Sequence, residues 1–183
     1  KNEAPKGGKK VLLSGVKPLA GRIIPSRDHT LIGKERTDVG RPHDQGYRIR
    51  GIVTEDALYL KNYEPSRWPA GNPETGYPDT DGSPTKSLIL GRGRQDRRDP
   101  FWQLNFGLRP AEEFYDLKTD QACAQNLAGT PAHTDRIKDL RQRMEAGLKA
   151  QQDPRMSGQG HLFDHYPPTA GAGFHEKIMR GEK

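Results

Sequence analysis

The chain has 183 residues, of which 31% are hydrophobic and 30% are charged, and its formal net charge is +6. This length predicts a single domain with a modest core, and the one cysteine excludes an internal disulfide or a metal site built from several cysteines. No apolar run approaches the length of about 20 residues that spans a bilayer, so we expect no membrane partner. The positive charge suits any polyanion, but 24 acidic residues lie among the basic ones, which is typical of a solvated mixed surface.

The first third of the chain is predicted to contain three short strands. After a connector at residues 1–23, Thr30–Ile32 predicts a strand that leads into a polar loop from Lys34 to Asp44. Alternating side chains predict the next strand at Tyr47–Val53. A returning strand at Ala57–Tyr63 then completes an antiparallel hairpin.

Residues 64–99 are predicted to form a long irregular loop, because five prolines recur there among Gly, Asp, Asn and Ser. Two aromatic side chains, Trp68 and Tyr77, are expected to anchor this loop to a neighbouring surface, since each buries a large area with few rotamers to freeze. A loop of this length in a compact domain is usually functional or a linker.

The rest of the chain is predicted to contain a strand at Glu112–Leu117, a short helix at Gln121–Leu127 and a longer helix from Pro131 to Gln151. Thr130 is the expected N-cap of the longer helix, with Pro131 at the first position, where a missing N–H costs nothing. Apolar residues at spacings of three and four predict one buried stripe on this helix, formed by Ile137, Leu140, Met144 and Leu148.

These elements predict an α+β fold, in which a small antiparallel sheet is packed by one long C-terminal amphipathic helix and joined by long irregular loops. Residues 24–153 are expected to form one subdomain, which includes the loop at 64–99. Pro154 ends the helix, and the tail at residues 154–183 is expected to wrap the surface of a larger body.

Three stretches carry a family resemblance. The first runs from Gly33-Lys34-Glu35-Arg36 through the hairpin to Pro65, and the second from Arg67-Trp68-Pro69 to Lys86. The third runs from the strand that ends in Tyr115-Asp116-Leu117 through Asn126-Leu127-Ala128 into the long helix. Taken together, most of residues 24 to 165 resemble the C-terminal portion of the type I sulfatases, the formylglycine-dependent members of the alkaline-phosphatase superfamily. They are similar in particular to the bacterial heparan N-sulfatase-like and arylsulfatase members.

The resemblance implies a hydrolase that removes sulfate-ester or N-sulfate groups from a sulfated saccharide, in the periplasm or outside the cell. It also implies that the formylglycine and the calcium site belong to an N-terminal sulfatase core, which would be the partner of this chain. Cys123 lies in Ala-Cys-Ala-Gln-Asn and lacks the Pro and Arg of the formylglycine motif, Cys/Ser-x-Pro/Ala-x-Arg. We therefore expect no catalytic residue, no metal ligand and no sulfatase activity in this chain alone.

Substrate recognition is the role that the resemblance leaves to this chain. A sulfated sugar is anionic and rich in hydroxyls, so its pocket needs guanidinium or ammonium groups for the charge and carboxylates or imidazoles for the hydroxyls. The polar loop supplies these groups at the end of a strand, and structural salt bridges would explain them equally well. The predicted substrate-binding residues are Lys34, Glu35, Arg36, Arg41, His43 and Asp44.

Two other interpretations of the function of this chain remain open. The net charge and the Gly91–Arg98 stretch fit a nucleic-acid-binding or polyanion-binding module, although zinc-finger spacing, a recognition-helix pattern and an aromatic RNA motif are absent from the sequence. A purely structural subdomain would leave all substrate contacts to the N-terminal core.

Overall fold

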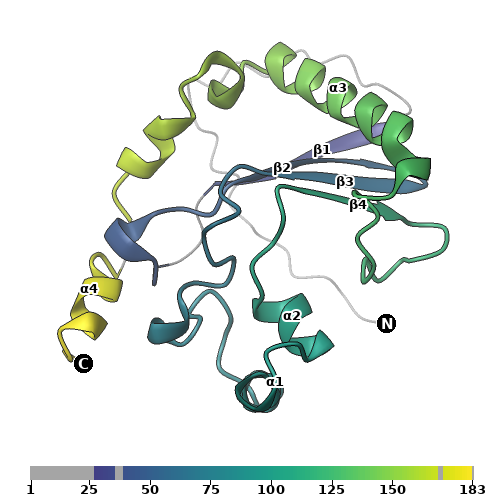
Figure 1. Cartoon of the computed structure of the whole chain (residues 1–183). Helices are drawn as coiled ribbons and strands as arrows, with labels where there is room; N and C mark the ends of the chain where they lie inside the picture. Colours follow the sequence, from purple (N-terminus) through teal and green to yellow (C-terminus); the bar gives the residue numbers. More distant parts are fainter. Residues whose placement is uncertain (1–26, 36–38, 169–170, 183) are drawn as a thin grey trace, which may run out of the picture.

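A computed structural model describes residues 27–35, 39–168 and 171–182, and within them the chain has an α+β fold. Its centre is an antiparallel four-stranded sheet in which the strand order follows the sequence (Figure 1). The predicted strands are confirmed within a few residues. They are β1 (His29–Lys34), β2 (Ile49–Thr54), β3 (Ala57–Asn62) and β4 (Glu112–Asp116).

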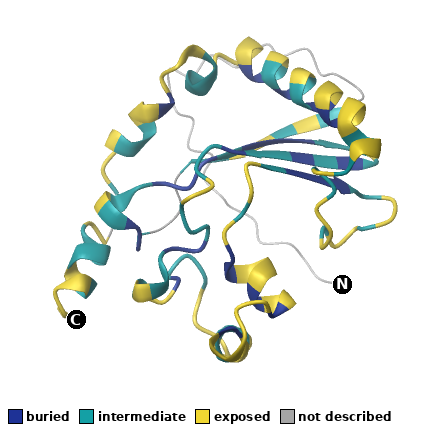
Figure 2. Ribbon diagram, in the orientation of Figure 1, coloured by how far each residue is buried: buried dark blue, intermediate teal, exposed yellow. Residues whose placement is uncertain are grey.

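One face of the sheet carries the main core. The register places Leu31 opposite Ile52, Ile52 opposite Tyr59, and Tyr59 opposite Phe114, so these side chains form one row across all four strands. Helix α3 (Thr134–Ala150) lies over this row (Figure 1). Its predicted stripe is confirmed, because all four apolar residues are buried and the outer side is exposed (Figure 2).

The start of α3 differs from the prediction. Residues Pro131–His133 form a 3-10 turn, and the helix proper begins at Thr134. Thr130 is the N-cap of this turn, but its side chain makes no capping bond, and the N-cap of the helix proper is His133. Pro131 nevertheless occupies the first position of the turn, where its missing N–H leaves no bond unmade.

The prediction of an irregular loop throughout residues 64–99 is wrong. This segment contains helix α1 (Pro84–Gln95), and helix α2 (Pro100–Phe106) follows directly after it. Each helix has a side-chain cap, because Ser83 accepts a hydrogen bond from the N–H of Lys86 and Asp99 accepts one from the N–H of Trp102. Both helices lie on the side of the sheet away from α3 (Figure 1).

A second core joins α1 and α2 to the segment before them. Buried Ala70, Tyr77, Trp102 and Phe106 form it, and Trp68 packs against them. The rings of Trp68 and Tyr77 meet edge to face, with their centroids 6.2 Å apart. Both residues were expected to anchor this segment, and they pack against each other and against the buried side chains of α2.

The predicted short helix at Gln121–Leu127 is also wrong, since these residues form turns. The carboxylate of Asp120 accepts hydrogen bonds from the backbone N–H groups of Ala124 and Gln125. The side chain of Asn126 accepts one from the backbone of Phe114 in β4. Side-chain acceptors thus compete with helical bonding in this segment.

The tail crosses the end of the sheet and runs down to α4 (Phe174–Met179), as Figure 1 shows. Short 3-10 helices at Pro154–Ser157 and Gly160–His165 interrupt it. No helix in the described part of the chain is both long and apolar enough to cross a membrane.

Candidate anion-binding site

The structure divides the predicted substrate-binding residues between two places. Lys34 and Glu35 lie at the end of β1, beside a small pocket. The other described members lie beyond residue 38, in and around a 3-10 turn at Pro42–Asp44. Arg36 lies outside the described residues. The loop therefore does not present its charged groups as one cluster.

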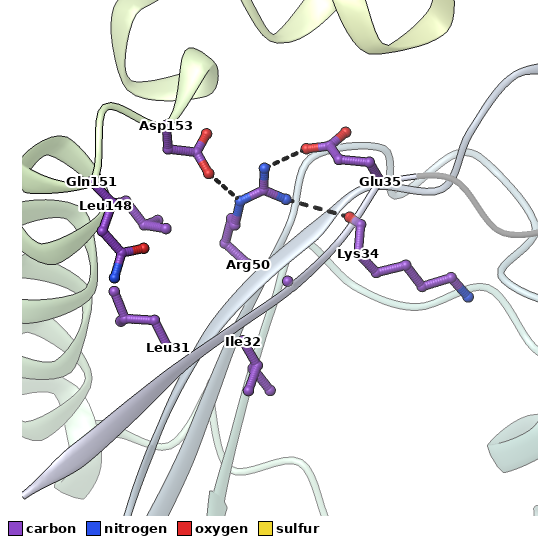
Figure 3. Close-up of a pocket in the computed structure, with 9 residues that line it drawn as sticks. Leu31, Ile32, Lys34, Glu35, Arg50, Leu148, Gln151 and Asp153 are labelled. Carbon is purple, nitrogen blue, oxygen red and sulfur yellow. Dashed lines mark hydrogen bonds and ion pairs between the residues drawn. The ribbon is translucent and has the colours of Figure 1, made fainter. Parts of the chain in front are cut away.

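The pocket beside Glu35 has a volume of about 260 Å³ and is crossed by the guanidinium of Arg50 (Figure 3). Arg50 lies 2.6 Å from a carboxylate oxygen of Glu35 and 2.7 Å from one of Asp153, and it donates to the carbonyl oxygens of Lys34 and Ile49. The Lys34 side chain points away from this group (Figure 3). The guanidinium of Arg50 is already paired with two carboxylates, so few of its N–H groups remain for an anionic ligand.

Glu35 also holds the tail of the chain. Its two carboxylate oxygens accept hydrogen bonds of 2.5 and 2.6 Å from Arg155, the bidentate geometry that suits a guanidinium and a carboxylate. The guanidinium of Arg155 lies over the ring of Tyr63, 4.9 Å from its centroid. Glu35 therefore joins β1 to the segment after α3.

Asp44 and His43 contact α4 and the residues before it. The Asp44 carboxylate accepts hydrogen bonds of 2.9 and 3.1 Å from the N–H of Gly173. The backbone N–H of His43 donates to Glu176 at 2.7 Å, while its side chain is 82% exposed. These contacts are structural, and the predicted binding of sugar hydroxyls by His43 stays a prediction.

Arg41 differs from the other members because it is buried and incompletely bonded. Only 1% of the residue is exposed. Its Nε and Nη2 atoms donate to the carbonyl oxygens of Trp68 and Pro69, each at 2.8 Å, and Nη2 also pairs closely with Asp79. Nη1 has no hydrogen-bond partner among the described residues. A buried N–H left unpaired is costly, which makes it a candidate for a bound oxygen.

Arg41 lines a cavity of about 420 Å³, here called the Arg41 cavity. Its wall supplies two guanidinium groups, a carboxylate, two amides, a hydroxyl and an indole. The lining residues are Arg41, Pro42, Gln45, Glu64, Ser66, Arg67, Trp68 and Asn72.

The second guanidinium of the Arg41 cavity belongs to Arg67. It donates to the carbonyl oxygen of Gly46 at 2.9 Å, but its contacts with Glu64 and Asp164 are long, at 3.4 Å each. Burial lowers the pKa of Arg67, and the charge of Glu64 opposes that shift. The long ion pairs leave this guanidinium able to donate to a further acceptor.

Sequence reasoning did not identify Arg67, Trp68 or Asn72 as site residues. They belong to a stretch that carries the family resemblance, Arg67-Trp68-Pro69 onward, but the expectation of a long loop gave no reason to place them beside Arg41. The signal that could have found them is the Arg67-Trp68 pair, because the planar fork of arginine suits an anionic group and an indole offers an apolar surface.

The described part of the chain contains no cluster of three or more His, Cys, Asp or Glu side chains that could hold a metal ion. No family model matches the chain, and a search of the curated proteins found no match. The resemblance to the sulfatases rests on the sequence motifs alone.

Proposed function

We propose that this chain is the C-terminal part of a sulfatase that acts on a sulfated saccharide, and that the Arg41 cavity binds an anionic group of the substrate. The observation that carries the proposal is that Arg41, which lines a polar cavity, is buried and has an Nη1 without a hydrogen-bond partner among the described residues. A sulfate oxygen at this position would accept the missing hydrogen bond, and charge-assisted bonds of this kind are the strong ones.

The remaining lining residues fit a sugar. Glu64 accepts hydrogen bonds from hydroxyls, and the side chains of Asn72, Gln45 and Ser66 both donate and accept. Trp68 adds an apolar surface for a ring face. In this arrangement the chain supplies binding energy, which an enzyme uses to lower the barrier at the reacting centre even when the contacts are remote from it.

Catalysis is assigned to the N-terminal core that the resemblance implies. Burial, together with nearby Asp120, raises the pKa of the Cys123 thiol, which opposes a role as nucleophile. The second face of the sheet also supports a place in a larger protein. It carries aliphatic side chains that are only half-buried or exposed, namely Ile32, Ile49, Val53, Leu58 and Leu60.

The test is isothermal titration calorimetry, in which the 183-residue chain is titrated with N-sulfoglucosamine and, separately, with glucosamine. A charge-assisted hydrogen bond contributes about 1.5–3 kcal/mol, so the sulfated sugar should bind about tenfold to a hundredfold more tightly. Arg41→Lys and Arg67→Lys keep the charge but lose the planar fork, and each should weaken binding of the sulfated sugar about tenfold. Circular dichroism would show that both variants fold.

The matched control is Arg98→Lys, because the Arg98 side chain is 91% exposed and contacts Asp96 outside the cavity. It should bind the sulfated sugar like the parent chain. Equal affinity for both sugars, or unchanged binding by both cavity variants, would disprove the proposal. Salt-dependent binding of random duplex DNA without sugar binding would favour the alternative, a polyanion-binding module.

A further inference from the structure

A second cavity shares one lining residue, Trp68, with the Arg41 cavity. Its volume is about 500 Å³, and Pro73 in its wall directly follows Asn72 in the wall of the first. The segment Trp68–Pro73 therefore contributes to both cavities. The lining residues are Trp68, Pro73, Arg97, Trp102, Gln103 and Leu108.

The wall of this second cavity is mainly aromatic and aliphatic. The rings of Trp68 and Trp102 meet edge to face at 6.3 Å, and Leu108 is an exposed large hydrophobic residue. Binding cavities for small molecules are typically apolar with a few polar groups that fix orientation. Arg97 and Gln103 are those groups here.

Arg97 is an exposed cation held in a fixed place. Its guanidinium lies over the ring of Trp102, 4.6 Å from the centroid, which is a favourable cation–π geometry. The backbone carbonyl of Arg97 accepts a hydrogen bond of 2.6 Å from the side chain of Gln103. Arg97 is exposed and lines the cavity, and among the described residues no carboxylate forms an ion pair with its guanidinium.

We propose that this second cavity is a subsite for the neighbouring sugar unit of a sulfated oligosaccharide, with Arg97 binding an anionic substituent on that unit. A pyranose ring has an apolar face, which fits the indole and aliphatic wall, and its sulfate or carboxylate fits the planar fork of an arginine. The inference rests on the proposed function, because the first sugar unit occupies the Arg41 cavity. It adds that the ligand spans at least two units.

Two joined subsites make binding of the second unit intramolecular, so affinity rises without any new contact at the first. A disaccharide of a uronic acid and N-sulfoglucosamine should therefore bind the chain at least about tenfold more tightly than N-sulfoglucosamine alone. Arg97→Gln should remove about tenfold of the disaccharide affinity and leave the monosaccharide within about twofold of the parent.

Arg98→Gln is the matched control, since it makes the same charge change one residue away and outside the cavity. It should leave both affinities within about twofold of the parent chain, measured at the same salt concentration. Arg97→Lys keeps a cation over Trp102 and serves as a second variant should Arg97→Gln fail to fold. It should retain part of the disaccharide affinity.

Fluorescence gives an independent readout, because the chain has only two tryptophans and both line the second cavity. In the parent chain, the disaccharide should change the tryptophan emission more than the monosaccharide does, because Trp102 lines only the second cavity.

The outcomes separate the two proposals. If the parent chain binds neither sugar, the proposed function is wrong and the subsite falls with it. If N-sulfoglucosamine binds but Arg97→Gln weakens both sugars equally, or neither, the subsite is wrong while the proposed function stands. If Arg97→Gln weakens binding of the disaccharide alone, the result supports both the proposed function and the subsite.

Discussion

Leu140 is a single residue on which the packing of α3 depends. It is 0% exposed and lies in the core that the helix forms with the sheet. We predict that Leu140→Ala lowers the free energy of unfolding by about 2–5 kcal/mol, the usual cost of a buried large-to-small change. Urea denaturation measures the change. Leu104→Ala is the control, because Leu104 is 45% exposed on α2, and it should cost less than about 0.5 kcal/mol.

Two glycines of α1 make a sharper comparison. A Cβ atom at Gly93 would lie 2.0 Å from Cδ1 of buried Trp102, whereas a Cβ at Gly91 would meet no atom within 4 Å. Gly93→Ala should therefore destabilise the chain by about 1–3 kcal/mol through overpacking. Gly91→Ala should stabilise it by about 0.4–1 kcal/mol, because alanine restricts the unfolded chain. Thermal unfolding that shifts in the same direction for both variants would contradict this account of the packing.

At the scale of elements, local patterns predicted some parts well and others poorly. The hairpin and α3 were predictable because their periods of two and about 3.6 residues are visible in the sequence. Helices α1 and α2 were missed because glycines and prolines in this stretch argued against a helix. The start signals were nevertheless present, since Ser83-Pro84 and Asp99-Pro100 each place a capping residue before a proline at the first helical position.

The ion pair between Arg50 in β2 and Asp153, which follows α3, predicts how the stability of the fold depends on pH. Burial would raise the pKa of Asp153, but the hydrogen bond from Arg50 and the charges of Arg50 and Arg155 outweigh it and lower the pKa. A carboxyl group whose pKa is lower in the folded state stabilises the fold above the unfolded value of about 3.9. That contribution is lost as pH falls through the folded pKa.

Asp153→Asn should therefore reduce stability near pH 7 and flatten its decline below about pH 4. Asparagine has nearly the same shape and can still accept the N–H of Arg155, which Asp153 caps. Melting temperatures of both proteins between pH 7 and pH 3 measure the effect. Parallel curves for the two proteins would show that the charge of Asp153 adds no pH dependence.

At the scale of the whole molecule, the candidate site was predictable only in its residue types. The sequence identified a loop rich in charge, but Glu35 pairs with Arg155, which lies 120 residues away, and Asp44 bonds to Gly173, 129 residues away. No local pattern reveals partners at such separations. The burial of Arg41 is equally invisible, because it depends on a segment that was expected to be irregular.

The path of the chain between β3 and β4 has a consequence for how this protein can change. The N–H of Asn62, at the end of β3, donates to the carbonyl of Ala111 at 2.9 Å, so the chain leaves the sheet and returns to it at adjoining positions. Residues 63–110 are thus an excursion with closed ends, and closure entropy grows only slowly with the length of such a loop. Most of the lining of both cavities lies on this excursion. Insertion, deletion or exchange within residues 63–110 can therefore reshape both cavities, while the strand register and the α3 core, whose buried residues all lie outside this range, stay as they are.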